Sequence, residues 1–162
     1  MFYFSPTKSH LLFLSDTTSP LPASDVTILG TTEWPRYQTA RMGISAFRAD
    51  VPNGMYCITL SLCELETVGE QEMSPYNLGN KALDTGFAGR QMSIAINDDL
   101  VADALRLDTY RATDLTHTIE VTDGHINVVF TSIEGATILN AIKIEQVKYP
   151  NRSSLTHCKI AQ

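Results

Sequence analysis

The sequence predicts an all-β fold, a sandwich or a barrel built from short strands and tight turns. Apolar and polar residues alternate with a period of two, which is typical of half-buried strands, in four runs: 55–64, 91–97, 117–122 and 125–131. Turn residues separate these runs at the spacing found in sandwiches and barrels. The 162 residues are enough for one domain with a sizeable core.

Each expected strand has its own pattern. In the run 55–64, every second residue from Tyr56 to Leu62 is apolar, so these residues share one face. The run 138–147 is richer in Ile and Val, and we expect a more central strand there. Shorter apolar runs at 44–51, His10–Leu14 and Val26–Leu29 suggest further strands, the last two at sheet edges. Residues 99–107 carry a weak apolar stripe and are the helix candidate of the chain.

Three turns are predicted from residues that tolerate unusual backbone angles. Pro52-Asn53-Gly54 follows the run 44–51, where the chain should reverse tightly. Asn97-Asp98 should form a similar turn, since both residues tolerate a left-handed conformation. Asp123-Gly124 separates two alternating runs by two residues, which predicts a type I′ hairpin.

The rest of the chain is less regular. Residues 66–90 hold five glycines and prolines and few periodic apolar positions, so we expect a long insertion, a feature that is often functional. We expect a single domain, with edge strands and loops in 1–36 and the main sandwich over 37–148. A loose tail follows at 149–162.

Composition and charge make several classes of partner and site unexpected for this chain. The formal net charge is −6 and no basic run occurs, so nucleic acid is an unexpected partner. The N-terminus lacks the pattern of a signal peptide, and no apolar run is long enough to insert into a membrane. Cys57, Cys63 and Cys158 form no C-x-x-C pair, and we expect small buried thiols.

The motifs of catalysis are missing from the sequence. It contains no G-x-S-x-G elbow and no H-E-x-x-H zinc motif, and the D-x-D-x-D-G calcium spacing is absent. Glu64 and Glu66 are close along the chain, but neighbours on one strand cannot flank a sugar from opposite faces as glycosidase carboxylates do. We therefore expect no catalytic residues, no metal and no cofactor in this chain.

Several segments resemble malectin and malectin-like domains. Tyr37-Gln38-Thr39-Ala40-Arg41 resembles the family's Y-Q-T-x-R, and 47–56 is similar to F-x-x-x-V-P-x-G-x-Y. Further segments match in the same order along the chain: 60–64, 91–97, 121–124 and 139–144. Tyr76-Asn77-Leu78-Gly79-Asn80 resembles the Y-N-L-G-N of malectin-like domains at the C-terminus of Bacteroidetes family 2 glycoside hydrolases, which are mostly β-galactosidase-like. The module is also classed as carbohydrate-binding module family 57.

This resemblance implies a two-sheet antiparallel β-sandwich of jelly-roll type. It also implies a non-catalytic accessory module that binds an oligo- or polysaccharide beside other domains of a β-galactosidase-like parent. The parent would be secreted or periplasmic. Catalytic carboxylates of such parents lie in a separate barrel domain.

Sugar binding by a sandwich usually needs exposed rings, because a pyranose stacks its C–H face on an aromatic side chain. We expect rings, one arginine and two acids to line any site: Trp34, Tyr37, Arg41, Glu66, Tyr76 and Glu134. At positions where malectin carries stacking rings, this chain has Met42, Glu66 and Thr67. The alternative is therefore a structural module between domains that has lost sugar binding.

Overall fold

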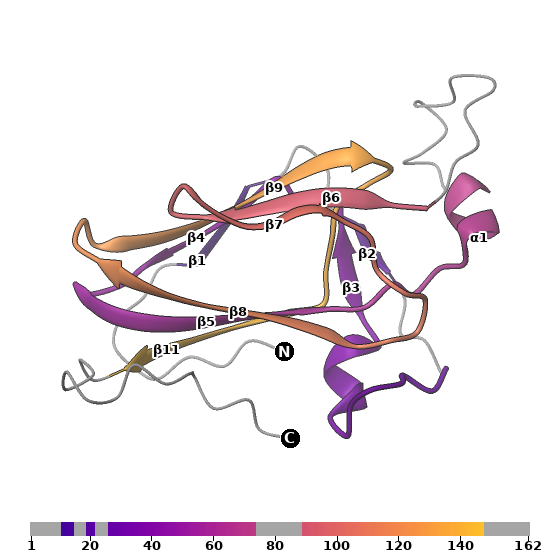
Figure 1. The fold of residues 1–162 in the computed structure, drawn as a ribbon, viewed down its shortest axis with the longest axis horizontal. Coiled ribbons are helices and arrows are strands. Elements are labelled where there is room, and N and C mark those ends of the chain that lie inside the picture. Colours follow the sequence, from indigo (N-terminus) through magenta and orange to yellow (C-terminus); the bar gives the residue numbers. More distant parts are fainter. Residues whose placement is uncertain (1–10, 15–18, 22–25, 74–88, 148–162) are drawn as a thin grey trace.

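The structure, a computed structural model, describes residues 11–14, 19–21, 26–73 and 89–147. It is an all-β antiparallel sandwich, as the sequence predicts (Figure 1). The upper layer in Figure 1 is a five-stranded sheet, in the order β1 (Leu11–Leu14), β4 (Ala46–Asp50), β9 (His125–Glu134), β6 (Gln91–Ile96), β7 (Asp99–Leu105).

Two smaller sheets complete the molecule. The facing layer has three strands, in the order β11 (Ala141–Val147), β5 (Gly54–Leu62), β8 (Thr113–Val121). A second three-stranded sheet consists of β10 (Ile138–Leu139), β3 (Ala40–Met42) and β2 (Ser19–Leu21). A 3₁₀ helix, η1 (Trp34–Tyr37), precedes β3, and α1 (Val68–Met73) follows β5. No helix within the described ranges is long and apolar enough to cross a membrane.

The core lies between the two main sheets and comes from the alternating residues of their strands. Phe47 of β4, Ile94 of β6 and Ile126 of β9 face Ile58 and Leu60 of β5, and each of these side chains is at most 1% exposed. Burial of such side chains removes their apolar surface from water, which is the dominant stabilising term of the fold.

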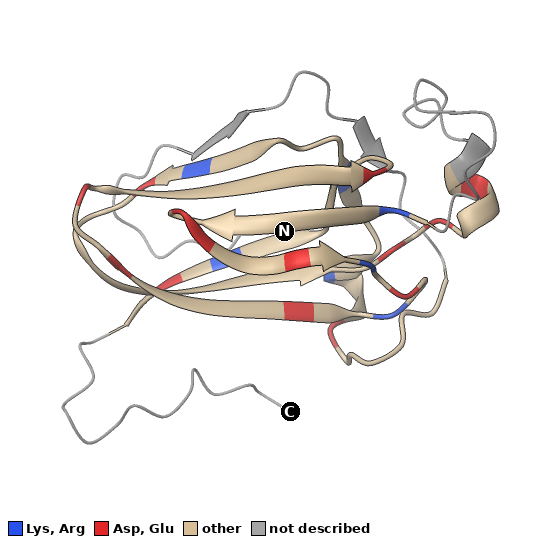
Figure 2. Cartoon of the chain, turned by 45° about the horizontal axis from the view of Figure 1, so that its top comes forward, with Lys and Arg blue, Asp and Glu red and all other residues tan. Residues whose placement is uncertain are grey.

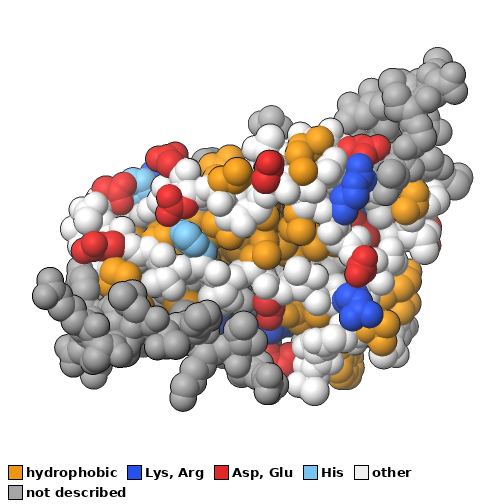
Figure 3. All heavy atoms as spheres, in the orientation of Figure 1, with side chains coloured by type: hydrophobic (Ala, Val, Ile, Leu, Met, Phe, Trp, Pro, Cys, Tyr) orange, Lys and Arg blue, Asp and Glu red, His pale blue; other side chains and the backbone are white. Residues whose placement is uncertain are grey.

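The sandwich is open along one long edge. Strands β7 and β8 are the end strands of the two main sheets, and no described strand pairs with their outer edges. Figure 3 shows hydrophobic side chains gathered between these two strands. Val101, Leu105 and Leu115 lie there, partly buried against the core.

The predicted turn at Asn97-Asp98 is confirmed. Both residues have positive φ, 44° and 72°, and they join β6 to its hairpin partner β7. Asn97 also accepts a hydrogen bond at Oδ1 from the backbone N–H of Asn127, at 2.7 Å. The edge strand expected at His10–Leu14 is present as β1, which pairs with β4.

The predicted hairpin at Asp123-Gly124 is wrong, because β8 and β9 belong to different sheets. The chain crosses from one layer to the other at this turn, and it does so again at Pro52-Asn53-Gly54. The two crossings lie side by side, since the N–H of Val51 donates to Gly124 O at 2.9 Å.

Two further element predictions are wrong. Residues 99–107 contain strand β7 rather than a helix, because pairing with β6 overrides the weak apolar stripe. Residues 26–29 form no strand, and only an isolated bridge joins Leu29 to Arg111.

The strand expected over 138–147 is interrupted at Asn140 and lies at a sheet edge as β11, whereas β5 is the central strand.

Of the three cysteines, Cys63 is a buried free thiol, as predicted. Cys57 is buried but disulfide-bonded, contrary to the prediction of a thiol. Cys158, the 149–162 tail and most of the 66–90 insertion lie outside the described residues.

Candidate ligand-binding site

The loops that carry most of the predicted site residues meet at one end of the sandwich, on the right of Figure 1. Strands β5, β7 and β9 end there, and β6 and β8 begin there. Backbone hydrogen bonds join these loops: the N–H of Leu29 donates to Tyr110 O, and the N–H of Tyr110 donates to Glu64 O, each at 2.8 Å. The loop end is therefore one connected surface.

Helix η1 places one ring in solvent and one in the core. Pro35 in its first turn fixes a backbone angle suited to a helix start. Trp34 is 50% exposed, whereas Tyr37 is 1% exposed. The indole can therefore stack on a ligand, but Tyr37 contributes packing instead of a binding surface, contrary to its predicted role.

Arg36 is on the same helix as Trp34 and contacts three neighbouring residues. Its guanidinium pairs with Glu33 at 2.7 Å and with Asp114 of β8 at 3.0 Å. It also donates to the hydroxyl of Tyr37 at 3.1 Å, and that hydroxyl donates to Asp114 at 2.7 Å. Burial, followed by the hydrogen bond with Asp114, raises the pKa of Tyr37. These contacts fix η1 against the start of β8.

A buried ion-pair cluster, the Glu64–Arg90–Glu66 cluster, lies under the start of the insertion. Arg90 donates from Nε to Glu64 at 2.6 Å and from Nη2 to Glu66 at 2.9 Å, and the Glu64 and Arg90 side chains are 2% and 3% exposed. Arg90 Nη1 also donates to Ala136 O at 2.7 Å. Burial raises the pKa of Glu66, and the charge of Arg90 opposes this change. Glu66 is thus engaged within the protein.

The predicted acid Glu134 lies on the same side of the molecule. Its carboxylate pairs with Arg106 at 2.6 Å, and both side chains are partly exposed. Arg106 also donates to Gln91 Oε1 at 3.2 Å and to the carbonyl oxygen of Gly89. This pair is open to solvent, so it could still hydrogen-bond to a sugar hydroxyl.

Asn140 explains why a polar residue interrupts the last apolar run. Its Oδ1 accepts from the N–H of Cys63 at 2.7 Å, and its Nδ2 donates to Tyr37 O at 2.9 Å and Thr39 O at 3.1 Å. A buried amide with all these partners ties the exit of η1 to the end of β5. Asn140 thereby holds the C-terminal end of η1, the helix that carries Trp34, in place.

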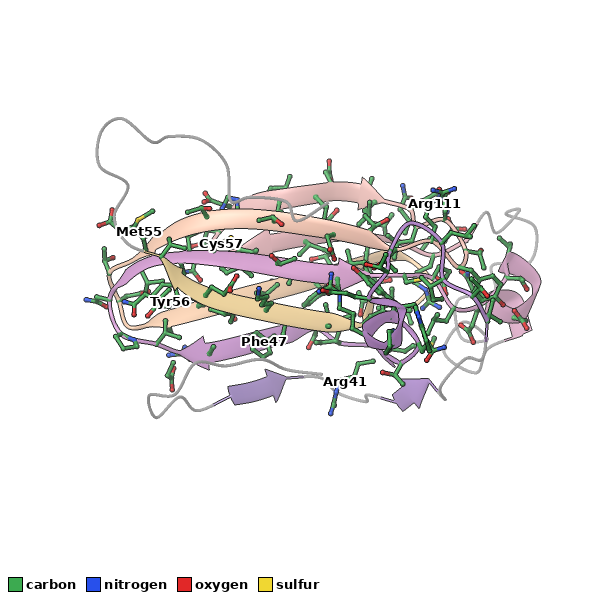
Figure 4. The ribbon with its side chains drawn as sticks, turned by 90° about the horizontal axis from the view of Figure 1, so that it is seen from below. Arg41, Phe47, Met55, Tyr56, Cys57 and Arg111 are labelled. Carbon is green, nitrogen blue, oxygen red and sulfur yellow. The ribbon has the colours of Figure 1, made fainter. Side chains whose placement is uncertain are left out.

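The structure thus brings four of the six predicted residues to the loop end: Trp34, Tyr37, Glu66 and Glu134. Arg41 on β3 is exposed elsewhere, and Figure 4 shows it on the opposite side of the molecule from Arg111 of the loop end. Tyr76 lies outside the described residues.

Sequence reasoning missed Arg36, Arg90 and Asp114. Each is a single charged residue without a motif, and its partner is distant in the chain. Only the match of 60–64 to the L-x-F-A-E pattern pointed to Glu64 as a special position.

No protein-family model matches the sequence, and no curated protein matches it. Solved structures do resemble it. Bacteroides uniformis β-glucuronidase 2 gives a TM-score of 0.64 at 22% identity over 85% of this chain and 14% of that chain. The ANXUR2 extracellular domain from Arabidopsis thaliana gives 0.59 at 15% identity over 84% of this chain and 41% of that chain.

The plant receptor-like kinase FER gives a TM-score of 0.58 at 18% identity, over 85% of this chain and 35% of that chain. At these identities, the likeness to all three proteins is a likeness of fold. The chain spans only a small part of the glucuronidase, and less than half of each plant protein.

Proposed function

We propose that this chain is a non-catalytic accessory domain that binds carbohydrate for a glycoside hydrolase. The observation that carries the proposal is Trp34, half exposed at the loop end on the same short helix as Arg36, an arginine that the protein holds in place. An exposed indole offers a flat apolar face for the C–H bonds of a pyranose, and fixed polar groups beside it can bind the hydroxyls.

The charged groups that hold η1 are already ordered. Arg36 is restrained by Glu33 and Asp114, and its guanidinium carbon lies 5.1 Å from the centre of the Tyr37 ring. A site that needs little ordering on binding loses less entropy, so even a small contact area can give useful affinity. The partly exposed Arg106–Glu134 pair extends the polar surface of the loop end.

A role inside a larger hydrolase rests on several supports. The chain resembles a small part of a protein named as a β-glucuronidase. The neighbouring carboxylates Glu64 and Glu66 share Arg90 rather than facing each other across a cleft, so they suit a structural role better than glycoside hydrolysis. The disulfide at Cys57 favours a secreted or periplasmic location, where disulfides persist. A β-galactosidase-like parent of bacterial origin remains part of the proposal.

The single tryptophan of the chain makes the test direct, because its fluorescence reports on Trp34 alone. We expect one class among galactosides, glucosides and plant polysaccharides to shift the emission and to protect the indole from acrylamide quenching. Calorimetry should detect binding by the wild type and a loss of at least about tenfold in affinity in Trp34→Ala, since ring stacking would dominate the contact.

Leu100→Ala is the matched control, since Leu100 is a similarly exposed apolar residue beside the Asn97-Asp98 turn, at the other end of the sandwich. The sugar affinity of Leu100→Ala should equal that of the wild type. If no sugar changes the emission or gives heat at millimolar concentration, the chain is instead a structural module between domains.

A further inference from the structure

An apolar row runs over four of the five strands on the outer face of the large sheet, from β4 to β7, and β1 lies beyond β4. The register aligns Ala46 of β4 with Val129 of β9, Val129 with Ala95 of β6, and Ala95 with Leu100 of β7. Cross-strand partners point to the same side of a sheet, so the four side chains form one continuous line. We call it the Ala46–Leu100 row.

The row is open to solvent although it is apolar. Val129 is 39% exposed and Leu100 is 63% exposed. The other two residues of the row, Ala46 and Ala95, are half-buried. Figure 2, in which the top of the molecule comes forward, shows that the strands carry few charges between their ends. A contiguous apolar line on an exposed sheet face marks a contact surface more often than a chance exposure.

We infer that this face is the interface of a weak dimer of two copies of the chain. A twofold axis parallel to the strands would place each row on the other copy's row in reverse order. Ala46 would then meet Leu100 of the second copy, and Val129 would meet its Ala95. A small residue opposes a large one at every position, so two sheets can pack face to face at a constant spacing of about 10 Å.

The charges beside the row are complementary in the same arrangement. Arg48 is aligned with Asn127, and Asn127 pairs with Asn97, which is followed at the turn by Asp98. The reversed order of strands brings Arg48 of one copy to Asp98 of the other, and the contact occurs twice. The Arg48 side chain is 44% exposed and already pairs with Asp50 at 3.1 Å, so its guanidinium is held on the outer face near the end of β4.

The size of the face sets the strength of the association. The four strands that carry the row, about 4.8 Å apart and roughly six residues long, cover on the order of 400 Å² in each copy. The total is below the roughly 1,000 Å² of a stable specific interface, so the dimer should form only at high concentration.

The test is sedimentation velocity of the full chain from about 10 µM to about 1 mM, the range in which weak interfaces populate. We expect the sedimentation coefficient of the wild type to rise with concentration. Leu100→Asp should weaken association at least tenfold, with unchanged circular dichroism because Leu100 is exposed. A chain that stays monomeric throughout, or a dimer that Leu100→Asp leaves intact, overturns the inference.

Charge exchange tests the predicted orientation. Arg48→Asp and Asp98→Lys should each weaken self-association, since each variant places like charges together twice. An equimolar mixture of the two should associate as strongly as the wild type, because both contacts then join opposite charges. Asp108→Lys, at the opposite end of the molecule, is the control and should change nothing. A mixture no stronger than its separate components contradicts the twofold arrangement.

Discussion

At the scale of single residues, Cys63 shows how the fold controls reactivity. The side chain is fully buried, and its thiol lies beside the backbone carbonyl of Glu64. Burial, with a smaller effect from the charge of Glu64, raises the pKa of Cys63 to about 11 from 9.0. Since the thiolate is the reactive form, we expect alkylation of the native protein at pH 8 to be at least about 100-fold slower than that of the unfolded chain.

The pH dependence follows from the same pKa change. The folded protein keeps the thiol protonated where the unfolded chain would lose the proton. The contribution of Cys63 to the free energy of unfolding is therefore constant below pH 9 and falls between pH 9 and about 11. Mass spectrometry after timed iodoacetamide treatment, with and without urea, measures the rates. Equal rates in the two conditions would show that the thiol is accessible.

Residue roles at the loop end were only partly predictable. The sequence identifies Trp34 as a ring in a turn-like region, and the structure places it in solvent. Tyr37 is in a similar setting in the sequence, yet it is buried because its hydroxyl finds Asp114, a residue far along the chain. A local pattern cannot show such a partner, so it cannot separate a binding ring from a core ring.

At the scale of elements, the Glu64–Arg90–Glu66 cluster holds the two ends of the insertion together. Arg90 precedes β6, and Glu64 follows β5; Gln71 of α1 accepts from the backbone N–H of Arg90 at 2.8 Å. Arg90→Ala would leave the carboxylate of Glu64 buried without its cation. We expect the free energy of unfolding to fall by about 3–5 kcal/mol, measured by urea denaturation.

Two further variants separate this effect from general packing loss. The double change Glu64→Gln with Arg90→Met removes both charges together, so it should cost much less than Arg90→Ala alone. Arg106→Ala breaks the more exposed pair with Glu134 and should cost about 1 kcal/mol or less. A cost for Arg90→Ala as small as that for Arg106→Ala would mean that water replaces the missing guanidinium.

Strands were easier to predict than their partners. Alternation identifies β5, β6, β8 and β9 because each buries one face. Strand β7 loses this signal, since it is a sheet edge with an irregular register and a positive φ at Ala104. Asp123-Gly124 has the composition of a hairpin turn, but β8 and β9 do not pair with each other. Instead β8 pairs with β5, and the chain crosses to the other sheet before β9 begins.

At the scale of the whole molecule, the sheets are assembled from distant segments. Met55 on β5 is aligned with Glu120 of β8 on one side and with Val147 of β11 on the other. Strand β4 similarly pairs with β9, although β5, β6, β7 and β8 lie between them in the sequence. The fold class follows from strand patterns alone, but this strand order does not, because it depends on contacts between residues that no local pattern links.

The same topology predicts slow folding. Loop-closure entropy must be lost before β5 can pair with β8 or β11, so the transition state is reached only after long-range contacts form. We expect refolding in milliseconds to seconds rather than microseconds, as for other all-β sandwiches of high contact order. Stopped-flow circular dichroism measures the refolding rate, because Trp34 fluorescence reports only on the loop end.

Leu60→Ala in the centre of β5 should slow refolding if that strand organises the transition state, whereas Leu100→Ala on the edge strand β7 should not. Refolding complete within microseconds would contradict a rate limited by pairing of distant strands.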